Sequence, residues 1–247
     1  MEHASPKKQK ITQPMKITIF STITNKDKSN VVQNLIKHST PSQDFYLMII
    51  LAISMATLGL LLNSASIVIG SMLISPMLYA FLSMSLGFSI SDTHLIGRSF
   101  YSIIKSLIIG VIVSALITLF MASDFSTNEV LSRISPSLAY AVVALIAGFA
   151  AAFTMTKPQL NEILPGIAIS VAIVPPIAVS GIGLATLQWD VFRGASSLFL
   201  VNTIAIVAGS LIVFSFMNIY AKRILAQQTL KDEEKRVESY TEESNQL

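Results

Sequence analysis

Residues 45–91 decide the fold, because this stretch, FYLMIILAISMATLGLLLNSASIVIGSMLISPMLYAFLSMSLGFSIS, contains no charged residue. An α-helix needs about 20 residues to cross the roughly 30 Å hydrocarbon core of a bilayer. The stretch is therefore too long for one membrane span and suits two. A polar cluster at 63–66, Asn-Ser-Ala-Ser, is typical of a turn. We predict membrane spans at 45–62 and 66–88.

Further apolar runs follow, separated by short segments that contain charged residues such as Asp92, Arg98 and Asp190. These runs predict four more spans, at 99–121, 135–155, 163–187 and 194–220. The sequence therefore predicts an all-α membrane protein with about six transmembrane helices. Its membrane domain covers residues 44–220, a polar lead-in covers 1–43, and a polar tail covers 221–247.

The composition agrees with a chain that is surrounded by lipid. Of the 247 residues, 52% are hydrophobic and 13% are charged, whereas a soluble domain usually carries about 25% charged residues. The net charge of +3 comes from Lys and Arg in the ends and short loops, so no nucleic-acid partner is expected. The chain contains no cysteine, which excludes disulfides and thiolate sites. No cleavable signal peptide is expected, because the lead-in is polar.

Positive charges predict how the chain crosses the membrane. With the N-terminus inside, the lead-in, the loops near Arg98 and Lys157, and the tail would all be cytoplasmic. Arg133 and Arg193 are then the only Lys or Arg residues on the opposite side. Because cytoplasmic loops carry an excess of Lys and Arg, both termini are predicted to lie in the cytoplasm, with the protein in the cell membrane. A helix at 29–38 would lie on the membrane surface or in solvent, and the tail is predicted to be a frayed helix or disordered.

The second and fifth predicted spans share a pattern. A shift of 99 residues places Pro76 on Pro175, and an aspartate follows each proline by 15 or 16 residues. Each half contains three spans, so the second half enters the membrane from the opposite side. We therefore predict two inverted-topology three-helix repeats, at about 45–121 and 135–220, a layout common in secondary transporters.

Pro76 and the pair Pro175 and Pro176 fall near the middle of these two spans. A proline lacks its N–H and crowds the carbonyl group four residues back, so it kinks or breaks a helix. The freed carbonyl groups must be covered by protein or face a wet cavity. Two breaks related by a pseudo-two-fold axis would meet near the middle of the membrane. The prolines therefore predict a binding site or a pore at this place.

The candidate lining residues are Ser71, Met72, Ser75, Pro76, Val171, Ala172, Pro175, Pro176 and Asn202. A simpler interpretation remains for each of them. Prolines often only kink membrane helices, serines often bond back to their own helix, and a buried asparagine often only joins two helices.

Five segments resemble a known family. They are ATLGLLLNS at 56–64, VIGSMLISP at 68–76, LPGIAI at 164–169, VPPIAV at 174–179 and LFLVN at 198–202. They are similar to the signatures of the prokaryotic membrane proteins grouped as domain-of-unknown-function family 389, and the resemblance covers roughly residues 45–220. It implies a polytopic membrane protein, but the family has no settled activity. Tyr79 and Ala80 stand where the family typically has a Gly-Pro pair, so a second break in that span is not expected.

The first functional hypothesis is a transporter or channel for a small solute or ion. No Asp, Glu or His lies in the apolar core of a predicted span, which disfavours a proton relay or an acidic cation site. Backbone and hydroxyl groups would still suit a neutral solute or a small ion, and helix N-termini would suit an anion. The bilayer and this solute are the expected partners.

An enzyme is not expected. The three histidines, His3, His38 and His94, lie outside the predicted spans, so a serine nucleophile would have no base there. No pair of buried carboxylates, metal cluster or Gly-rich phosphate loop appears, and we predict no catalytic, cofactor-binding or metal-binding residue. The alternative hypothesis is a structural or assembly protein of the membrane that transports nothing. A homo-oligomer is compatible with either hypothesis.

Overall fold

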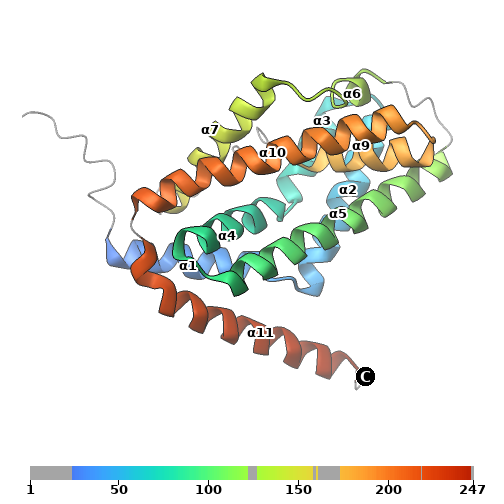
Figure 1. Cartoon of the computed structure of the whole chain (residues 1–247). Coiled ribbons are helices and arrows are strands. Elements are labelled where there is room, and N and C mark those ends of the chain that lie inside the picture. The colour runs from blue at the N-terminus through green and yellow to red at the C-terminus, as the bar shows by residue number, and fades with distance from the viewer. Residues whose placement is uncertain (1–23, 122–126, 158–159, 161–172, 218, 246–247) are drawn as a thin grey trace, which may run out of the picture.

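The computed structural model describes residues 24–121, 127–157, 160, 173–217 and 219–245, and all regular elements among them are helices (Figure 1). In chain order they are α1 Asn25–Ser39, α2 Gln43–Leu61, α3 Ala65–Ile74, α4 Met77–Ile90, α5 Thr93–Met121, α6 Asn128–Leu131, α7 Leu138–Met155, α9 Val174–Ala185, α10 Trp189–Phe216, the 3-10 helix η2 Ile219–Lys222 and α11 Arg223–Asn245. The prediction of an all-α chain is confirmed for this part of the protein.

Four helices, α2, α5, α7 and α10, are long and apolar enough to cross a membrane. Together α3 and α4 qualify as a fifth span that is bent by 50° at its break. The fifth predicted span, 163–187, falls partly outside the described residues, and its described helix α9 has 12 residues. A helix of that length extends only about 18 Å, so α9 alone does not cross a bilayer. The described helices thus provide four or five of the six predicted spans.

Several predicted loops belong to helices. Arg98 lies inside α5, which begins at Thr93, and Asp190 lies in the first turn of α10. Asp92 immediately precedes α5, and its carboxylate accepts the backbone N–H of Leu95 at 2.9 Å. The two aspartates that follow the prolines therefore occupy different positions, one before its helix and one within it.

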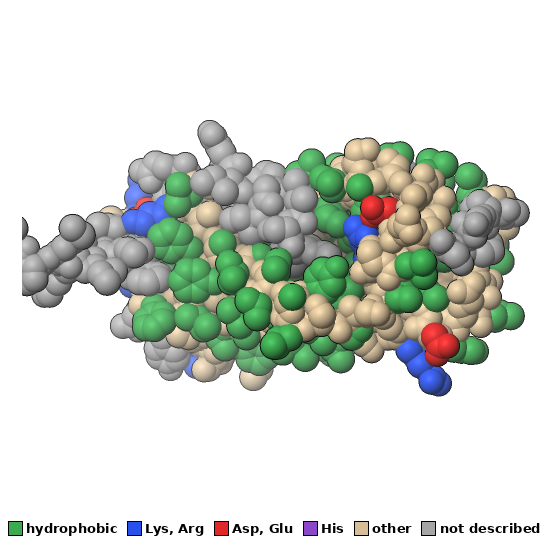
Figure 2. All heavy atoms as spheres, turned by 90° about the horizontal axis from the view of Figure 1, so that it is seen from above, with side chains coloured by type: hydrophobic (Ala, Val, Ile, Leu, Met, Phe, Trp, Pro, Cys, Tyr) green, Lys and Arg blue, Asp and Glu red, His purple; other side chains and the backbone are tan. Residues whose placement is uncertain are grey.

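The long helix α5 is arranged as expected for a helix that faces lipid. Its buried face carries small or polar residues at the helical repeat, namely Ser99, Ser102, Ser106, Gly110, Ser114 and Thr118. Its exposed face carries Ile104, Ile108, Ile112, Leu116 and Phe120. This arrangement, with small residues buried and large apolar residues exposed, is the reverse of the arrangement in a helix of a soluble protein. Figure 2 shows the same preference on one face of the molecule, where apolar side chains dominate and charged ones are few.

Helix α9 occupies the interior of the bundle. Every residue from Val174 to Gly183 is buried, and the helix packs against α2, α3, α5 and α10. A helix that is apolar on all sides can face lipid or protein, and the burial of α9 shows that protein surrounds it. The part of the second proline motif that the structure describes therefore lies at the centre of the protein.

One turn geometry joins three pairs of helices. In each, a glycine carbonyl accepts the backbone N–H five residues later, at 2.8 to 3.0 Å. The residue just before that donor has a positive φ of 51° to 57°. This is a Schellman turn, which satisfies the last carbonyl groups of a helix. The three sets of glycine, left-handed residue and donor are Gly59, Asn63 and Ser64; Gly87, Ser91 and Asp92; Gly183, Leu187 and Gln188.

The helices α7 and α10 cross at two glycines. A Cβ atom on Gly148 would meet the backbone of Ile206, and one on Gly209 would meet the backbone of Leu145. Close backbone approach at small residues is the usual way in which membrane helices associate. This crossing holds α7 to the rest of the bundle, because α10 is the main neighbour of α7 among the described elements.

The two polar ends of the chain form helices that pack on the bundle. The apolar face of α1, formed by Val31, Val32, Leu35 and Ile36, is fully buried against α4 and α11. Figure 1 shows α11 running along this side of the bundle. The tail is thus an ordered helix over Arg223–Asn245, and α1 is covered by protein and not by a membrane surface.

Candidate functional site

The break between α3 and α4 lies where the sequence predicts it, at Ser75 and Pro76. Ser75 ends α3 with an extended backbone, and Pro76 directly precedes α4. The hydroxyl of Ser75 accepts the backbone N–H of Met77 at 3.4 Å, a long bond that caps the new helix. After this point α4 continues unbroken to Ile90, so the prediction of a single break in this span is confirmed.

The second proline motif starts a helix. Val174, Pro175 and Pro176 form the first turn of α9, and all three are buried. The first four N–H groups of a helix normally lack a partner inside it. Two of these positions are prolines, which have no N–H. The helix can therefore begin inside the protein with few unpaired donors, and this makes its start a weaker anion site than other helix starts.

The other predicted lining residues have more ordinary surroundings. Ser71 donates its hydroxyl to the carbonyl of Val68, in its own helix, at 2.6 Å, so the simpler interpretation holds for it. Met72 is buried in α3. Asn202 is also buried, with 2% of its surface exposed, near the midpoint of α10. Val171 and Ala172 lie outside the described residues.

These residues are brought together only in part. Helix α3, which carries Ser71 and Met72, contacts α9, and α9 also contacts α10, which carries Asn202. Ser180, one turn after the prolines, donates to the carbonyl of Pro176 at 2.8 Å and lies 3.2 Å from the hydroxyl of Ser196 in α10. The second proline motif therefore lies in the core of the bundle, the first is half-buried beside it, and the hydroxyl groups of Ser71 and Ser180 are bonded within the protein.

The sequence analysis missed a row of buried hydroxyl groups on α5. Ser99, Ser102 and Ser106 lie at the spacing of one helix face and are at most 1% exposed. Their hydroxyl groups have no hydrogen-bond partner in the described part of the chain. The hydroxyl of Tyr46, from α2, is also buried and interacts with that of Ser102, although the two make no well-formed hydrogen bond. We call these four residues the hydroxyl file; the serine spacing in the sequence was the available signal.

Arg98 lies directly before the hydroxyl file. Its Nη2 donates to the carbonyl of Ile36, in α1, at 3.3 Å. Its Nε and Nη1 atoms are buried without a hydrogen-bond partner in the described structure. A buried guanidinium with unused donors is costly unless an acceptor is supplied. Arg98 therefore marks a place where an anionic or acceptor group would be stabilised.

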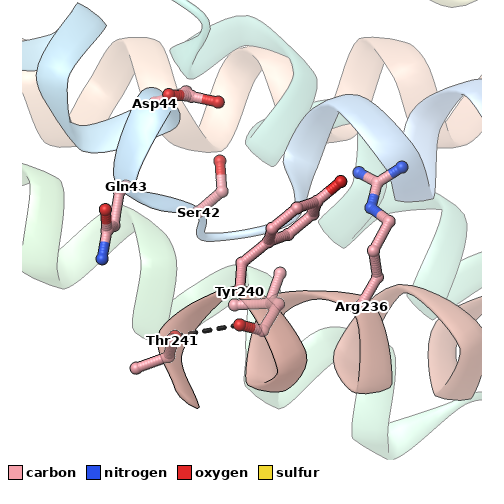
Figure 3. A pocket seen from close by; sticks show the side chains of 7 residues that line it. Ser42, Gln43, Asp44, Arg236, Tyr240 and Thr241 are labelled. Atoms are coloured by element: carbon pink, nitrogen blue, oxygen red, sulfur yellow. Dashed lines mark hydrogen bonds between the residues drawn. The ribbon is translucent and has the colours of Figure 1, made fainter. Parts of the chain in front are cut away.

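Among the described residues, three cavities lie between α11 and the bundle. The largest, about 470 Å³, is lined by Ser42, Gln43 and Asp44 on one side and by α11 on the other. Figure 3 shows that the side chains of Arg236 and Tyr240 project from α11 toward the rest of the bundle. The second, about 400 Å³, is lined by residues that include Asp92 and His94.

The third cavity, about 180 Å³, is lined by Arg98 and, from α11, by Glu234 and Glu238. Arg98, which directly precedes the hydroxyl file in α5, thus borders a cavity under α11. The charge of Glu234 acts on Arg98, and Glu234 also lies 3.8 Å from His94. The interface between α11 and the bundle is therefore polar and incompletely packed.

His38 joins α1 to the bundle on the same side. Its ring stacks on Tyr79 with the ring centres 4.9 Å apart. Partial burial lowers the pKa of His38 below its ordinary value, and Lys37 adds to this effect, while Glu233 opposes it. The neutral imidazole is therefore the form that this contact favours.

Comparison with known proteins adds a family but no activity. The chain is 29% identical over 174 residues to an uncharacterised protein of Methanocaldococcus jannaschii, an alignment that covers 70% of this chain and 54% of that protein. The chain thus spans about half the length of this relative. No solved structure matches the chain.

The family comparison covers the part of the chain that contains both proline motifs. Residues 72–208 match the family described as a domain of unknown function, DUF389. This match includes the break at Pro76, the three serines of the hydroxyl file on α5 and the start of α9. It covers more than half of the chain, and the protein therefore belongs to the DUF389 family.

Proposed function

We propose that the protein allows a small solute or ion to pass through the cell membrane, at a site between the two proline motifs. The observation that carries this proposal is that two helices begin at prolines, α4 at the half-buried Pro76 and α9 in the interior at Pro175 and Pro176. Backbone that is not helical at membrane depth is tolerated where it is covered by protein or lines a wet cavity. Transporters use such interrupted helices to build their binding sites.

The directions of the two helices support an inverted repeat. In Figure 1, α4 runs from its proline toward the left of the view and α9 runs from its prolines toward the right. Each is followed by the same glycine turn and then by a long helix, of 29 residues in α5 and 28 in α10. Two copies of a helix, turn and long helix that run in opposite directions are what an inverted-topology repeat requires. We further propose that both termini are cytoplasmic and that the protein is not an enzyme.

The test is flux from proteoliposomes that contain the purified protein. Chloride, a monovalent cation and a neutral solute such as glycerol are each loaded and their efflux followed. The variants are Pro76→Ala and the double variant Pro175→Ala with Pro176→Ala, which restore backbone donors and allow straight helices. Pro136→Ala is the matched control, because Pro136 is exposed outside the helices. We expect a large loss of flux in the first two variants and none in the control.

The alternative is a membrane protein that has an assembly role and transports nothing. It is favoured by the hydroxyl groups of Ser71 and Ser180, which bond to their own helices and do not face a solute. Absence of flux for all three solutes, from parent protein that unfolds cooperatively, would support this alternative. Flux that is equal in the parent and both proline variants would place the passage elsewhere.

A further inference from the structure

The hydroxyl file carries a more specific inference. Each buried hydroxyl without a partner costs about 1–3 kcal/mol, and most buried polar groups have a partner. Elsewhere in this protein the buried serines obey that rule, since Ser85 and Ser210 bond to each other at 2.6 Å and Ser39 and Ser83 at 2.9 Å. Ser99, Ser102 and Ser106, on one face of α5, make no well-formed hydrogen bond among the described residues, although Tyr46 interacts with Ser102, and this indicates a place where a ligand completes the hydrogen bonds.

The position of the file links it to the second proline motif. Gly110 of α5 lies against Ile177, and Ser114 donates to the carbonyl of Ala178 at 2.6 Å. The two helices therefore run in the same direction, side by side (Figure 1). One turn before Gly110, Ser106 lies about level with the start of α9. The file thus extends from Arg98 to the helix start that the proposed passage uses.

The charges along this path decide the class of ligand. The path begins at the guanidinium of Arg98, whose Nε and Nη1 atoms are buried without a partner among the described residues, and this group supplies the positive charge, because the two prolines at the start of α9 offer no N–H. Between Arg98 and the start of α9 lie hydroxyl groups, which can donate, and no carboxylate of the described residues belongs to the file. We propose that the hydroxyl file and Arg98 bind a small monovalent anion such as chloride. The idea that the anion moves along this path rests on the proposed function, but the binding of the anion does not depend on it.

Helix α11 controls access to the file. Glu234 lines the same cavity as Arg98, and its negative charge acts on the guanidinium without a direct ion pair in the described structure, so it opposes an external anion there. The anion and Glu234 therefore compete. Removing this carboxylate is expected to strengthen anion binding, which is the opposite of what a role for Glu234 as an anion carrier or a cation ligand would give.

Binding is tested by thermal unfolding of the full chain in detergent, with chloride replacing gluconate at constant ionic strength. A ligand that binds the native state raises the unfolding temperature with its concentration. We expect chloride to stabilise the parent protein. Ser102→Ala combined with Ser106→Ala should weaken the apparent affinity at least about tenfold, because each lost bond to a charged group contributes more than a neutral one. Glu234→Gln should increase it several-fold.

Matched controls separate binding from folding. Ser102→Ala and Ser106→Ala remove unpartnered hydroxyl groups, so unfolding in gluconate should be unchanged or slightly later. Ser210→Ala removes a bonded hydroxyl and should unfold earlier in gluconate but keep its full response to chloride. Arg98→Gln should lose the chloride response, whereas Lys26→Gln, the same change of charge at an exposed position of α1, should keep it.

Chloride efflux from the same proteoliposomes distinguishes this inference from the proposed function. Stabilisation by chloride that depends on Ser102 and Ser106, without efflux of any solute, keeps the site and refutes passage. Efflux of glycerol or a cation that depends on the prolines, without any stabilisation by chloride, keeps passage and refutes the anion site. A chloride response that survives in the double serine variant also refutes it.

Discussion

The glycine crossing of α7 and α10 allows a prediction with an internal control. Gly148→Ala places a methyl group against the backbone of Ile206, which cannot rotate away as a side chain can. Overpacking of this kind costs about 1–3 kcal/mol, and contact with backbone puts it at the upper end. Alanine gains about 1 kcal/mol over glycine in a helix. The expected net loss of stability is therefore about 2 kcal/mol.

Gly97→Ala makes the same chemical change where nothing opposes it. Gly97 lies on the exposed side of α5, and its Cβ would meet no atom within 4 Å. Only the gain in helix propensity remains, so this variant should be more stable than the parent by about 1 kcal/mol. Two identical substitutions in helices of one protein are thus expected to have opposite signs.

The assay is unfolding in mixed micelles with increasing SDS, followed by far-UV circular dichroism, for both variants and the parent. Gly209→Ala, which meets the backbone of Leu145, should resemble Gly148→Ala. The double variant should cost less than the sum, because the first methyl group already separates the helices. A Gly148→Ala protein as stable as the parent, or equal shifts in Gly97→Ala and Gly148→Ala, would refute the close crossing.

Three further predictions concern the turns, the topology and pH. Leu187→Gly should stabilise the protein by about 1 kcal/mol, because Leu187 has a φ of 57° that costs a side-chain-bearing residue about 1–2 kcal/mol; a lower SDS midpoint would contradict this. Since the chain has no cysteine, single cysteines at Lys26 and Glu129 report topology cleanly, and an impermeant maleimide outside intact cells should label only the second. Burial lowers the folded-state pKa of His38, so its contact with Tyr79 contributes stability above the ordinary pKa of about 6.5 that is lost as the pH falls toward the folded-state value. His38→Gln should therefore reduce the acid sensitivity of unfolding, and an unchanged pH profile would exclude this role.

The spans could be predicted because lipid excludes charge, and the 45–91 stretch has none. Helix ends were less predictable, since hydropathy detects the part of a helix that lies in hydrocarbon and not the helix itself. Arg98 and Asp190 continue the backbone hydrogen bonding of α5 and α10 beyond that part. The ordered α11 was missed for a related reason. Its stability comes from contacts with α1, which its polar composition does not reveal.

The part of the candidate site that depends on the covalent structure of proline could be predicted from the sequence. Proline lacks an N–H, so the break at Pro76 and the start of a helix at the second proline motif follow from the sequence. Whether each serine hydroxyl is hydrogen-bonded does not follow from the sequence, because Ser71 and Ser106 both lie among apolar residues of a helix. Only the neighbours across the bundle show that the first hydroxyl is bonded and the second is not.

The repeated glycine turn has a consequence for how the chain enters the membrane. Each turn closes its own backbone hydrogen bonds, so two helices joined by it form a hairpin with little exposed polar backbone. The turn between α2 and α3 contains only uncharged residues, Leu62, Asn63 and Ser64. Moving it across a bilayer therefore requires no buried charge. The α2–α3 hairpin can insert during synthesis as one preformed unit, before the helices that later surround it have been made.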